Sequence, residues 1–191
     1  LALGWLRERG EVSKLLRLGG ALWFFWWMRG YYTEGAAQLA ALLAVSGVES
    51  ITPARARALN GAGVIALWMG DAGRSAALLE EALALARELG DDREAAFALV
   101  ALSTTLSIGA SDYERAAAAA AESLALARAA SDLEGVALAS GNLALILDIQ
   151  GKAGEAAPLY QEALAIRRDL GDRWSLNILL NNLGTRAAGR G

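Results

Sequence analysis

The chain has 191 residues, of which 55% are hydrophobic and 20% charged, a composition that suits one soluble globular or solenoid unit and argues against disorder. It contains no cysteine and no histidine, which excludes disulfides, thiolate and imidazole chemistry and the commonest zinc sites. The net charge of −3 comes from scattered single charges, so we expect neither nucleic-acid nor membrane binding, and we predict no cofactor and no metal.

The chain opens with LALGWLRERG, which has the pattern of a helix already under way. This stretch contains neither the basic start nor the cleavage site of a signal peptide. We therefore expect the sequence to be a segment of a longer cytoplasmic protein.

An aromatic run follows, ALWFFWWMRGYY from Ala21 to Tyr32, in which seven of twelve residues are Trp, Phe or Tyr. A membrane-spanning helix needs about 20 consecutive apolar residues. The uninterrupted apolar run here has eleven, from Leu18 to Met28, between Arg17 and Arg29. The run therefore favours a buried helix over a membrane anchor, and a cage for an aromatic or sugar ligand is the alternative.

The chain repeats itself about every 40 residues. Residues typical of turns recur at spacings of 40, 41 and 40, and a shared aspartate recurs in the later units. The turn residues are Gly30, Gly70, Ser111 and Gly151, and the aspartates are Asp91, Asp132 and Asp172. We predict a single solenoid over residues 1–191, with repeats at 11–50, 51–91, 92–131 and 132–171 and a partial repeat at 172–191.

Each repeat has the pattern of two helices, because apolar residues recur at intervals of three and four between runs of Gly, Asp and Ser. Thr52 before Pro53 is typical of an N-cap followed by a first-turn proline. Capping-box spacing is found at Asp91 with Glu94, Ser111 with Glu114 and Ser131 with Glu134. Strand signals are missing, so we predict an all-α protein of about ten helices.

These units resemble the tetratricopeptide repeat (TPR), a pair of antiparallel helices with small residues at fixed places. In the second unit the matching residues are Gly63, Gly70, Asp71, Ser75, Leu79 and Ala82. In the fourth unit they are Ala144, Gly151, Lys152, Ala156, Tyr160 and Ala163, and Gly184 restarts the pattern. The resemblance implies a right-handed α-solenoid of helix pairs, while Thr104 and Ser107 depart from the TPR pattern in the third unit.

Two kinds of repeat array are similar to different parts of the chain. The stretch from Trp5 to Ala44 resembles the segment after the nucleotide-binding domain in large bacterial signalling-ATPase regulators that carry a LuxR-type helix-turn-helix. The stretch from Gly141 to Asp172 is similar to kinesin-light-chain repeats. Because no GxxxxGK[ST] motif is present, the resemblance implies a sensing or interaction region for signal transduction and transcription regulation, without the ATPase.

The first helix of each pair lines the concave side of a TPR-type solenoid. Helical geometry places four asparagines on or near that side, together with a cation, an aromatic ring and a hydroxyl. These candidate groove residues are Arg57, Asn60, Trp68, Thr105, Asn142, Asn181 and Asn182. An amide both donates and accepts, so such residues can bind the main chain of a peptide. The alternative is that the asparagines cap turns or bond between adjacent helices.

The repeat pattern places Trp23 at the small-residue position of the first unit. We expect Trp23 and Trp26 to face the partner helix and a preceding helix at Leu3–Arg9. We expect Phe24, Trp27 and Met28 to face the groove mouth or the next layer. The predicted result is an N-terminal aromatic layer of Trp23, Phe24, Trp26 and Trp27, packed on Trp5 and Leu6.

The last predicted helix, from Asp172 to about Ala188, has no second helix within the sequence to cover its apolar side. The residues left uncovered are Leu176, Leu179, Leu180 and Leu183. We therefore predict self-association through this helix.

The sequence favours a non-catalytic module that binds a protein or peptide partner or a small inducer. A purely structural spacer or self-association array without its own ligand is the alternative. An enzyme is not expected, because the candidate carboxylates occupy helix and turn positions where solvated charge is usual. These carboxylates are Glu80, Glu81, Asp91, Asp92 and Glu162.

Overall fold

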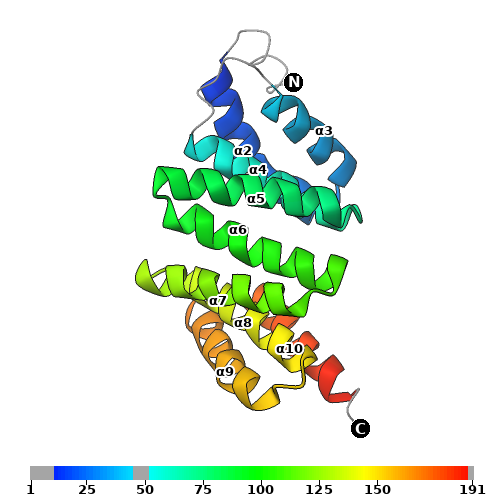
Figure 1. Ribbon diagram of the computed structural model, residues 1–191, viewed down its shortest axis with the longest axis vertical. Helices are drawn as coiled ribbons and strands as arrows, with labels where there is room; N and C mark the ends of the chain where they lie inside the picture. Colours follow the sequence, from blue (N-terminus) through cyan, green and yellow to red (C-terminus); the bar gives the residue numbers. More distant parts are fainter. Residues whose placement is uncertain (1–10, 45–51, 189–191) are drawn as a thin grey trace.

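The computed structural model describes residues 11–44 and 52–188, and every regular element in these two ranges is helical (Figure 1). The helices are α2 (Val12–Met28), α3 (Tyr32–Leu43), α4 (Pro53–Trp68), α5 (Ala72–Leu89), α6 (Asp92–Thr105), the π-helical turn η1 (Leu106–Ala110), α7 (Tyr113–Ala129), α8 (Leu133–Ile149), α9 (Ala153–Asp169) and α10 (Arg173–Ala188). They stack as consecutive pairs into an elongated array (Figure 1), and the predicted all-α fold is confirmed.

Residues in the left-handed backbone conformation mark the turns at nearly constant spacing. They are Gly30, Gly70, Gly90, Ser111, Ser131, Gly151 and Gly171. From Gly70 onward neighbours are 20 residues apart, except that Gly90 and Ser111 are 21 apart. The extra residue falls where α6 continues into η1, whose hydrogen bonds span one residue more than those of an α-helix. The 41-residue spacing in the sequence is therefore absorbed by a π-helical turn.

Two of the predicted N-caps are confirmed. The Thr52 hydroxyl oxygen accepts a hydrogen bond from the Arg55 backbone N–H at 3.2 Å, and Pro53 is the first residue of α4. A carboxylate oxygen of Asp91 accepts a hydrogen bond from the Glu94 backbone N–H at 3.1 Å. Each cap satisfies a backbone donor that has no partner inside its helix.

The N-caps predicted at Ser111 and Ser131 are wrong by one residue. Asp112 caps α7 and Asp132 caps α8, each accepting a backbone hydrogen bond from three residues further on, at 3.2 Å. Both serines instead have positive φ, 52° and 54°, and they end the preceding helical segment. Because an N-cap residue needs a more extended backbone than these serines have, the aspartate that follows each of them takes the cap, and its negative charge suits the helix N-terminus.

The aromatic run lies on α2 and the following turn, and Trp26 is its buried member. Trp26 packs on Gly35 of α3, where a Cβ would lie 2.9 Å from Trp26 Cβ and 2.8 Å from Ile65 of α4. Within the described residues no helix has the length and apolarity needed to cross a membrane. The predicted helix Leu3–Arg9, with Trp5 and Leu6, lies outside the described residues.

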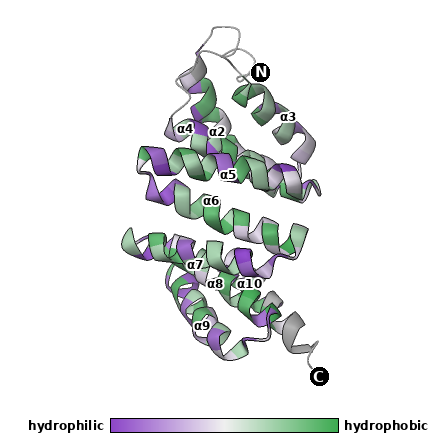
Figure 2. Ribbon diagram, viewed as in Figure 1, coloured by the Kyte–Doolittle hydropathy of each residue, from purple (hydrophilic) through white to green (hydrophobic). Residues whose placement is uncertain are grey.

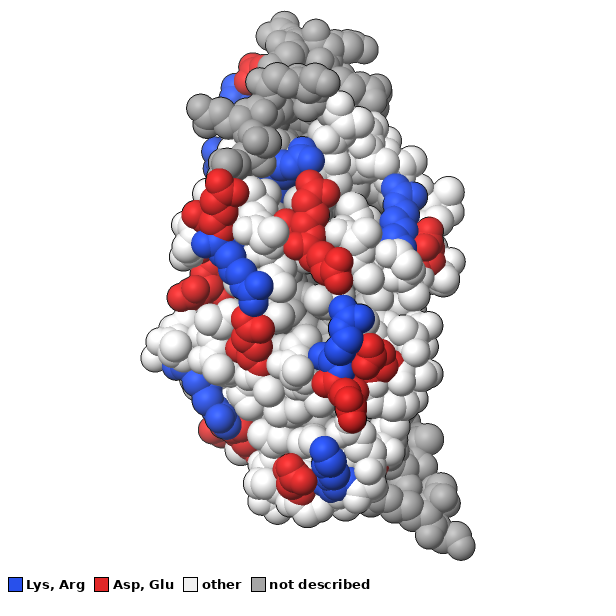
Figure 3. All heavy atoms as spheres, in the orientation of Figure 1, with Lys and Arg blue, Asp and Glu red and all other residues white. Residues whose placement is uncertain are grey.

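Figure 2 shows hydrophilic and hydrophobic segments interspersed along α5 and α7, as expected for helices with one buried side. Ion pairs connect the second helices of successive repeats: Arg87 of α5 pairs with Glu122 of α7, and Arg128 of α7 pairs with Glu162 of α9 at 2.8 Å. We call these two the second-helix ion pairs. Figure 3 shows basic and acidic side chains lying beside one another on one face, rather than as a patch of one sign.

Asp172 precedes α10 and accepts two hydrogen bonds. Its Oδ1 accepts from the Ser175 backbone N–H at 3.0 Å, and its Oδ2 accepts from Arg167 at 2.9 Å. Hydrogen bonds from the Ser175 side chain and backbone, with the charge of Arg167, hold the pKa of the Asp172 carboxyl below its ordinary value.

Because the folded pKa of Asp172 is the lower one, this carboxylate stabilises the fold at pH values above the unfolded pKa of about 3.9. That contribution is lost as the pH falls through the folded pKa. We expect Asp172→Asn to be less stable than the parent at pH 6, and the difference to shrink below about pH 4. Urea unfolding of both proteins at pH 6 and pH 3 measures this, and an equal difference at both pH values would contradict it.

Candidate functional site

The candidate site is a pocket of about 460 Å³ lined mainly by the first helices of the first four repeats, α2, α4, α6 and α8, with one residue from α7. We call it the central pocket. Its lining residues are Trp23, Arg57, Asn60, Arg93, Glu94, Ala96, Phe97, Val100, Ser123, Asp132, Glu134, Gly135 and Leu138. The sequence places aromatic, amide, guanidinium and carboxylate groups in this one space.

A buried carboxylate forms the polar side of the central pocket. Glu94 of α6 is 7% exposed, and its Oε1 accepts a hydrogen bond from Arg57 Nε of α4 at 2.7 Å. Glu94 Oε2 accepts from Asn60 Nδ2 at 3.0 Å. Asn60 is 1% exposed, and its Oδ1 has no hydrogen-bond partner among the described residues. A buried amide oxygen without a partner therefore lies in a residue that lines the pocket.

Exposed charges of both signs stand at the rim. Arg93 Nε lies 3.5 Å from an Asp132 oxygen, and an Arg93 terminal nitrogen lies 3.9 Å from Glu134. The Arg93 side chain is exposed, and contacts of this length hold it weakly. The Arg93 guanidinium can therefore turn to a ligand carbonyl or carboxylate.

An aromatic pair forms the apolar side. The ring of Trp23 lies 5.6 Å from the ring of Phe97, measured between centroids, at an interplanar angle of 58°. Trp23 fits against α4 because the residue beside it is Gly61, where a Cβ would lie 2.4 Å from Trp23 Cγ. Leu138, partly exposed on α8, completes this apolar surface.

The aromatic surface continues beyond the pocket. Trp27 of α2 lies edge-on to Trp68 of α4 and to Trp174 of α10, with ring centroids 6.1 Å and 5.8 Å apart. Phe24, Trp68 and Trp174 are exposed. Because α2 and α10 belong to the first and last repeats and still touch here, this side of the array is concave. The first helices therefore line the inner surface, as the repeat pattern implies.

Some of the groove residues predicted from the sequence lie on the inner surface, and others pack between repeats. Arg57 and Asn60 line the central pocket, and Trp68 lies on the aromatic surface. Asn142 Nδ2 lies 2.7 Å from Ser103 Oγ, 3.2 Å from Thr104 Oγ1 and 3.3 Å from the Val100 carbonyl oxygen. The Asn142 amide therefore donates from α8 to α6. This is the alternative given above, in which the asparagines bond between helices instead of binding a ligand.

The prediction that Thr105 lines the groove is wrong. Its side chain is buried, and its hydroxyl shares a hydrogen bond of 2.8 Å with Ser75 of α5. Thr105 therefore connects the two layers of helices instead of facing a ligand. Asn181 is exposed on α10, and Asn182 lies in α10 with its side chain outside the described part, so a groove role for these two stays a prediction.

In the predicted aromatic layer, Trp26 packs in the core as expected, and Trp23 faces the central pocket as well as α4. Arg93, Phe97 and Leu138 were not predicted from the sequence. The pattern of a single repeat does not mark these residues as lining a pocket. Glu94 was noticed for its capping-box spacing, which describes its backbone and does not reveal where its carboxylate binds.

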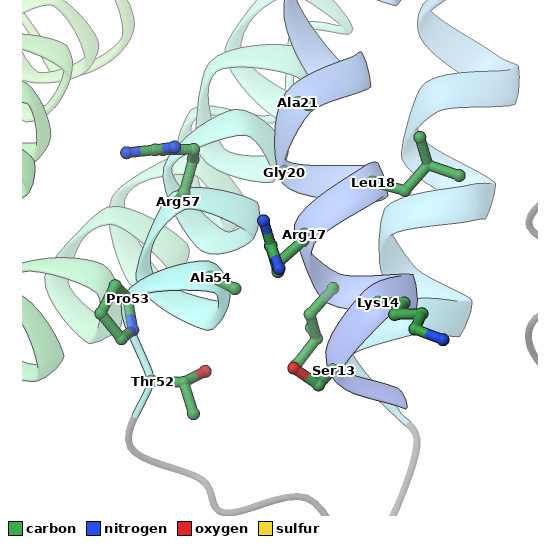
Figure 4. Close-up of a pocket in the computed structure, with 11 residues that line it drawn as sticks. Ser13, Lys14, Arg17, Leu18, Gly20, Ala21, Thr52, Pro53, Ala54 and Arg57 are labelled. Carbon is green, nitrogen blue, oxygen red and sulfur yellow. The ribbon is translucent and has the colours of Figure 1, made fainter. Parts of the chain in front are cut away.

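A second hollow, of about 820 Å³, lies between the first half of α2 and the start of α4 (Figure 4). Figure 4 shows Arg17 pointing into this space from α2, with Thr52 and Pro53 on the opposite side. Its cations, Lys14, Arg17 and Arg57, are exposed side chains. Among the described residues no buried polar atom without a partner lines it, so the central pocket is the better candidate.

Solved structures with a similar fold define the class of protein. BtubC (BKLC) from P. vanneervenii matches with a TM-score of 0.76 and 18% identity, over 98% of this chain and 80% of that one. The "putative kinesin light chain nearly identical TPR-like repeats" of Podospora anserina match with a TM-score of 0.66 and 15% identity, over 92% and 96%. The TPR domain of Arabidopsis FLU gives 0.54 and 22%, over 58% and 92%. The fold is a TPR-like superhelix, as predicted.

The proteins that are similar to this chain in sequence differ from those that are similar in structure. Proteins named "Putative HTH-type transcriptional regulator" from Mycobacterium bovis and Mycobacterium tuberculosis are 32% identical to this chain over 107 residues. The match covers 52% of this chain and 12% of the regulator, so the chain spans a small part of these relatives. No family model matches the chain.

Proposed function

We propose that this TPR module is the non-catalytic sensing and interaction region of a bacterial transcriptional regulator, and that its central pocket binds a segment of a protein partner. One observation carries the proposal: a single pocket of about 460 Å³ combines an aromatic floor, exposed charges of both signs and a buried amide oxygen without a partner. Pockets that bind ligands have volumes of roughly 300–1,000 Å³ and this kind of mixed lining.

The chemistry of the pocket suits a peptide. Trp23, Phe97 and Leu138 offer an apolar surface for one side chain. Arg93 can bind a carbonyl or carboxylate, and Asn60 Oδ1 can accept an N–H. A peptide supplies all three groups within a few residues, whereas a small inducer that binds here would need an apolar body with both a donor and an anionic end.

The similarity to regulators supports the cellular role and does not identify the ligand. The alternative function is a spacer without its own ligand, and it predicts that the pocket side chains matter only for folding. Self-association through the exposed apolar side of α10 remains a further proposal.

The test is an array of random 12-residue peptides probed with the parent protein and three variants. We expect Leu138→Asp and Arg93→Ala to weaken the best hits at least tenfold, because they remove the apolar surface and the exposed guanidinium at the rim. Both side chains are exposed enough for the variants to fold. Ile108→Asp, at an exposed apolar residue outside the pocket, is the matched control and should bind like the parent. Equal binding by all four proteins would contradict the proposal.

A further inference from the structure

The aromatic rings of the inner surface form an unbroken row that starts in the central pocket. Phe97, which lines the pocket, lies 5.6 Å from Trp23, and Trp23 lies 5.6 Å from Phe24, measured between ring centroids. Phe24 lies 5.6 Å from Trp27, and Trp27 lies 6.1 Å from Trp68. We call these rings the ring row. The apolar side of the pocket therefore continues toward the ends of α2 and α4.

The ring row follows one side of each of these two helices. Trp23 and Trp27 are four residues apart on α2, which places them on the same side of the helix. On α4 the residues Asn60, Val64 and Trp68 follow one another at the same interval and form a stripe. The sequence of α4 contains no charged residue from Asn60 to Trp68. The path from the pocket to Trp68 is therefore apolar.

The far end of the ring row is open to solvent. Trp68 is 57% exposed and Phe24 is 50% exposed, whereas Trp26 on the same helix as Phe24 is buried. Because α2 and α4 each pack against their own second helices, α3 and α5, these rings are exposed within complete repeats. Exposed aromatic rings beside a pocket are typical of binding surfaces, in which tryptophan carries an unusual share of the binding energy.

The length of the stripe on α4 sets the spacing that a ligand needs. From Asn60 to Trp68 the helix rises about 12 Å. In an extended peptide, residues four positions apart point to the same side and lie about 13 Å apart. We propose that the partner segment carries a second large apolar residue, an aromatic one, four positions from the residue in the central pocket, and that this second residue packs on Phe24 and Trp68. This inference rests on the peptide binding proposed above.

Continuity with the pocket favours one segment over two separate ligands. Each ring of the row touches the next, so a segment that leaves the pocket along α2 and α4 stays on aromatic surface. The rim of the pocket carries the charged side chains of Arg93, Asp132 and Glu134 instead. The ring row is therefore the place for a second apolar side chain of the segment, and the rim is the place for its polar groups.

The test is a set of 12-residue peptide libraries with leucine fixed at the sixth position, tryptophan placed one to five residues before or after it, and the other positions randomised. A library without the fixed tryptophan is the reference. We expect the labelled 191-residue protein to bind about fivefold more strongly than the reference where tryptophan lies four residues from leucine, on one of the two sides.

Two variants show whether the ring row causes this preference. Trp68→Ala should lose it, and the variant should fold because Trp68 is more than half exposed. Phe25→Ala is the matched control and should keep the preference, because Phe25 is half exposed on α2 but contacts Tyr31, outside the ring row. Circular dichroism checks the fold of both variants, and the comparison of spacings needs the parent alone.

The outcomes separate this inference from the function on which it rests. If the libraries bind equally at every spacing, if another spacing is preferred, or if Trp68→Ala keeps the preference, the second anchor is overturned while peptide binding in the central pocket stands. If no library binds, the reference included, the proposed function of the central pocket fails together with the second anchor.

Discussion

Replacing Gly61 with alanine is expected to lower the free energy of unfolding by about 1–2 kcal/mol, although alanine is the better helix former. The added Cβ would lie 2.4 Å from Trp23 Cγ and 2.8 Å from Trp23 Cδ1. Trp23 cannot move away freely, because the rings of Phe24 and Phe97 also lie against it, each at a centroid distance of 5.6 Å. The strain therefore outweighs the gain in helix propensity. Urea unfolding followed by circular dichroism measures the change.

Gly184→Ala is the matched control, since a Cβ there meets nothing within 4 Å. It should raise the free energy of unfolding by about 0.5–1 kcal/mol, the usual advantage of alanine over glycine inside a helix. Opposite signs for the two variants are required. Stabilisation by both would mean that Trp23 is not seated on Gly61.

Replacing Glu94 with alanine is expected to destabilise the protein by about 2 kcal/mol, because a buried amide loses its side-chain acceptor. Asn60 Nδ2 would keep only the Glu94 backbone carbonyl, at 3.3 Å, and Arg57 would lose its partner. The same change should abolish peptide binding in the central pocket. Thermal and urea unfolding at pH 7 measure the first effect.

Glu81→Ala is the comparison for this carboxylate. Glu81 pairs with Arg55 at 3.1 Å but is half exposed, so its loss should cost less than about 1 kcal/mol. If Glu81→Ala and Glu94→Ala destabilise equally, the burial of Glu94 is not what makes it important.

The repeat and the helix pairs follow from the sequence because they depend on periodicity and on turn residues. Gly30, Gly70, Ser111 and Gly151 each have the positive φ that a sharp turn requires. The sequence shows the extra residue of the third repeat as a spacing of 41 between turn residues. It does not show which local structure holds that residue. A π-helical turn and a loop longer by one residue give the same number of residues between turns, so only the packing of the helices decides between them.

The site was less predictable, because its side chains meet across repeats. Trp23 occupies a position where other repeats have a small residue, and it is accommodated by Gly61 on the next first helix. Asn142 was expected to face a ligand, yet Ser103 and Thr104 of the preceding repeat bind its amide. Such contacts depend on how two repeats are stacked, which a single repeat's pattern does not contain. Thr105 was misplaced for the same reason.

The central claim is that the central pocket is where a partner segment binds. The most direct test is an ¹H–¹⁵N NMR titration of the labelled protein with the tightest peptide from the array. The account predicts that the Trp23 indole signal and the Phe97 and Leu138 backbone signals shift, while the indole of the buried Trp26 changes little. Shifts confined to the second-helix ion pairs, with Trp23 unchanged, would contradict it.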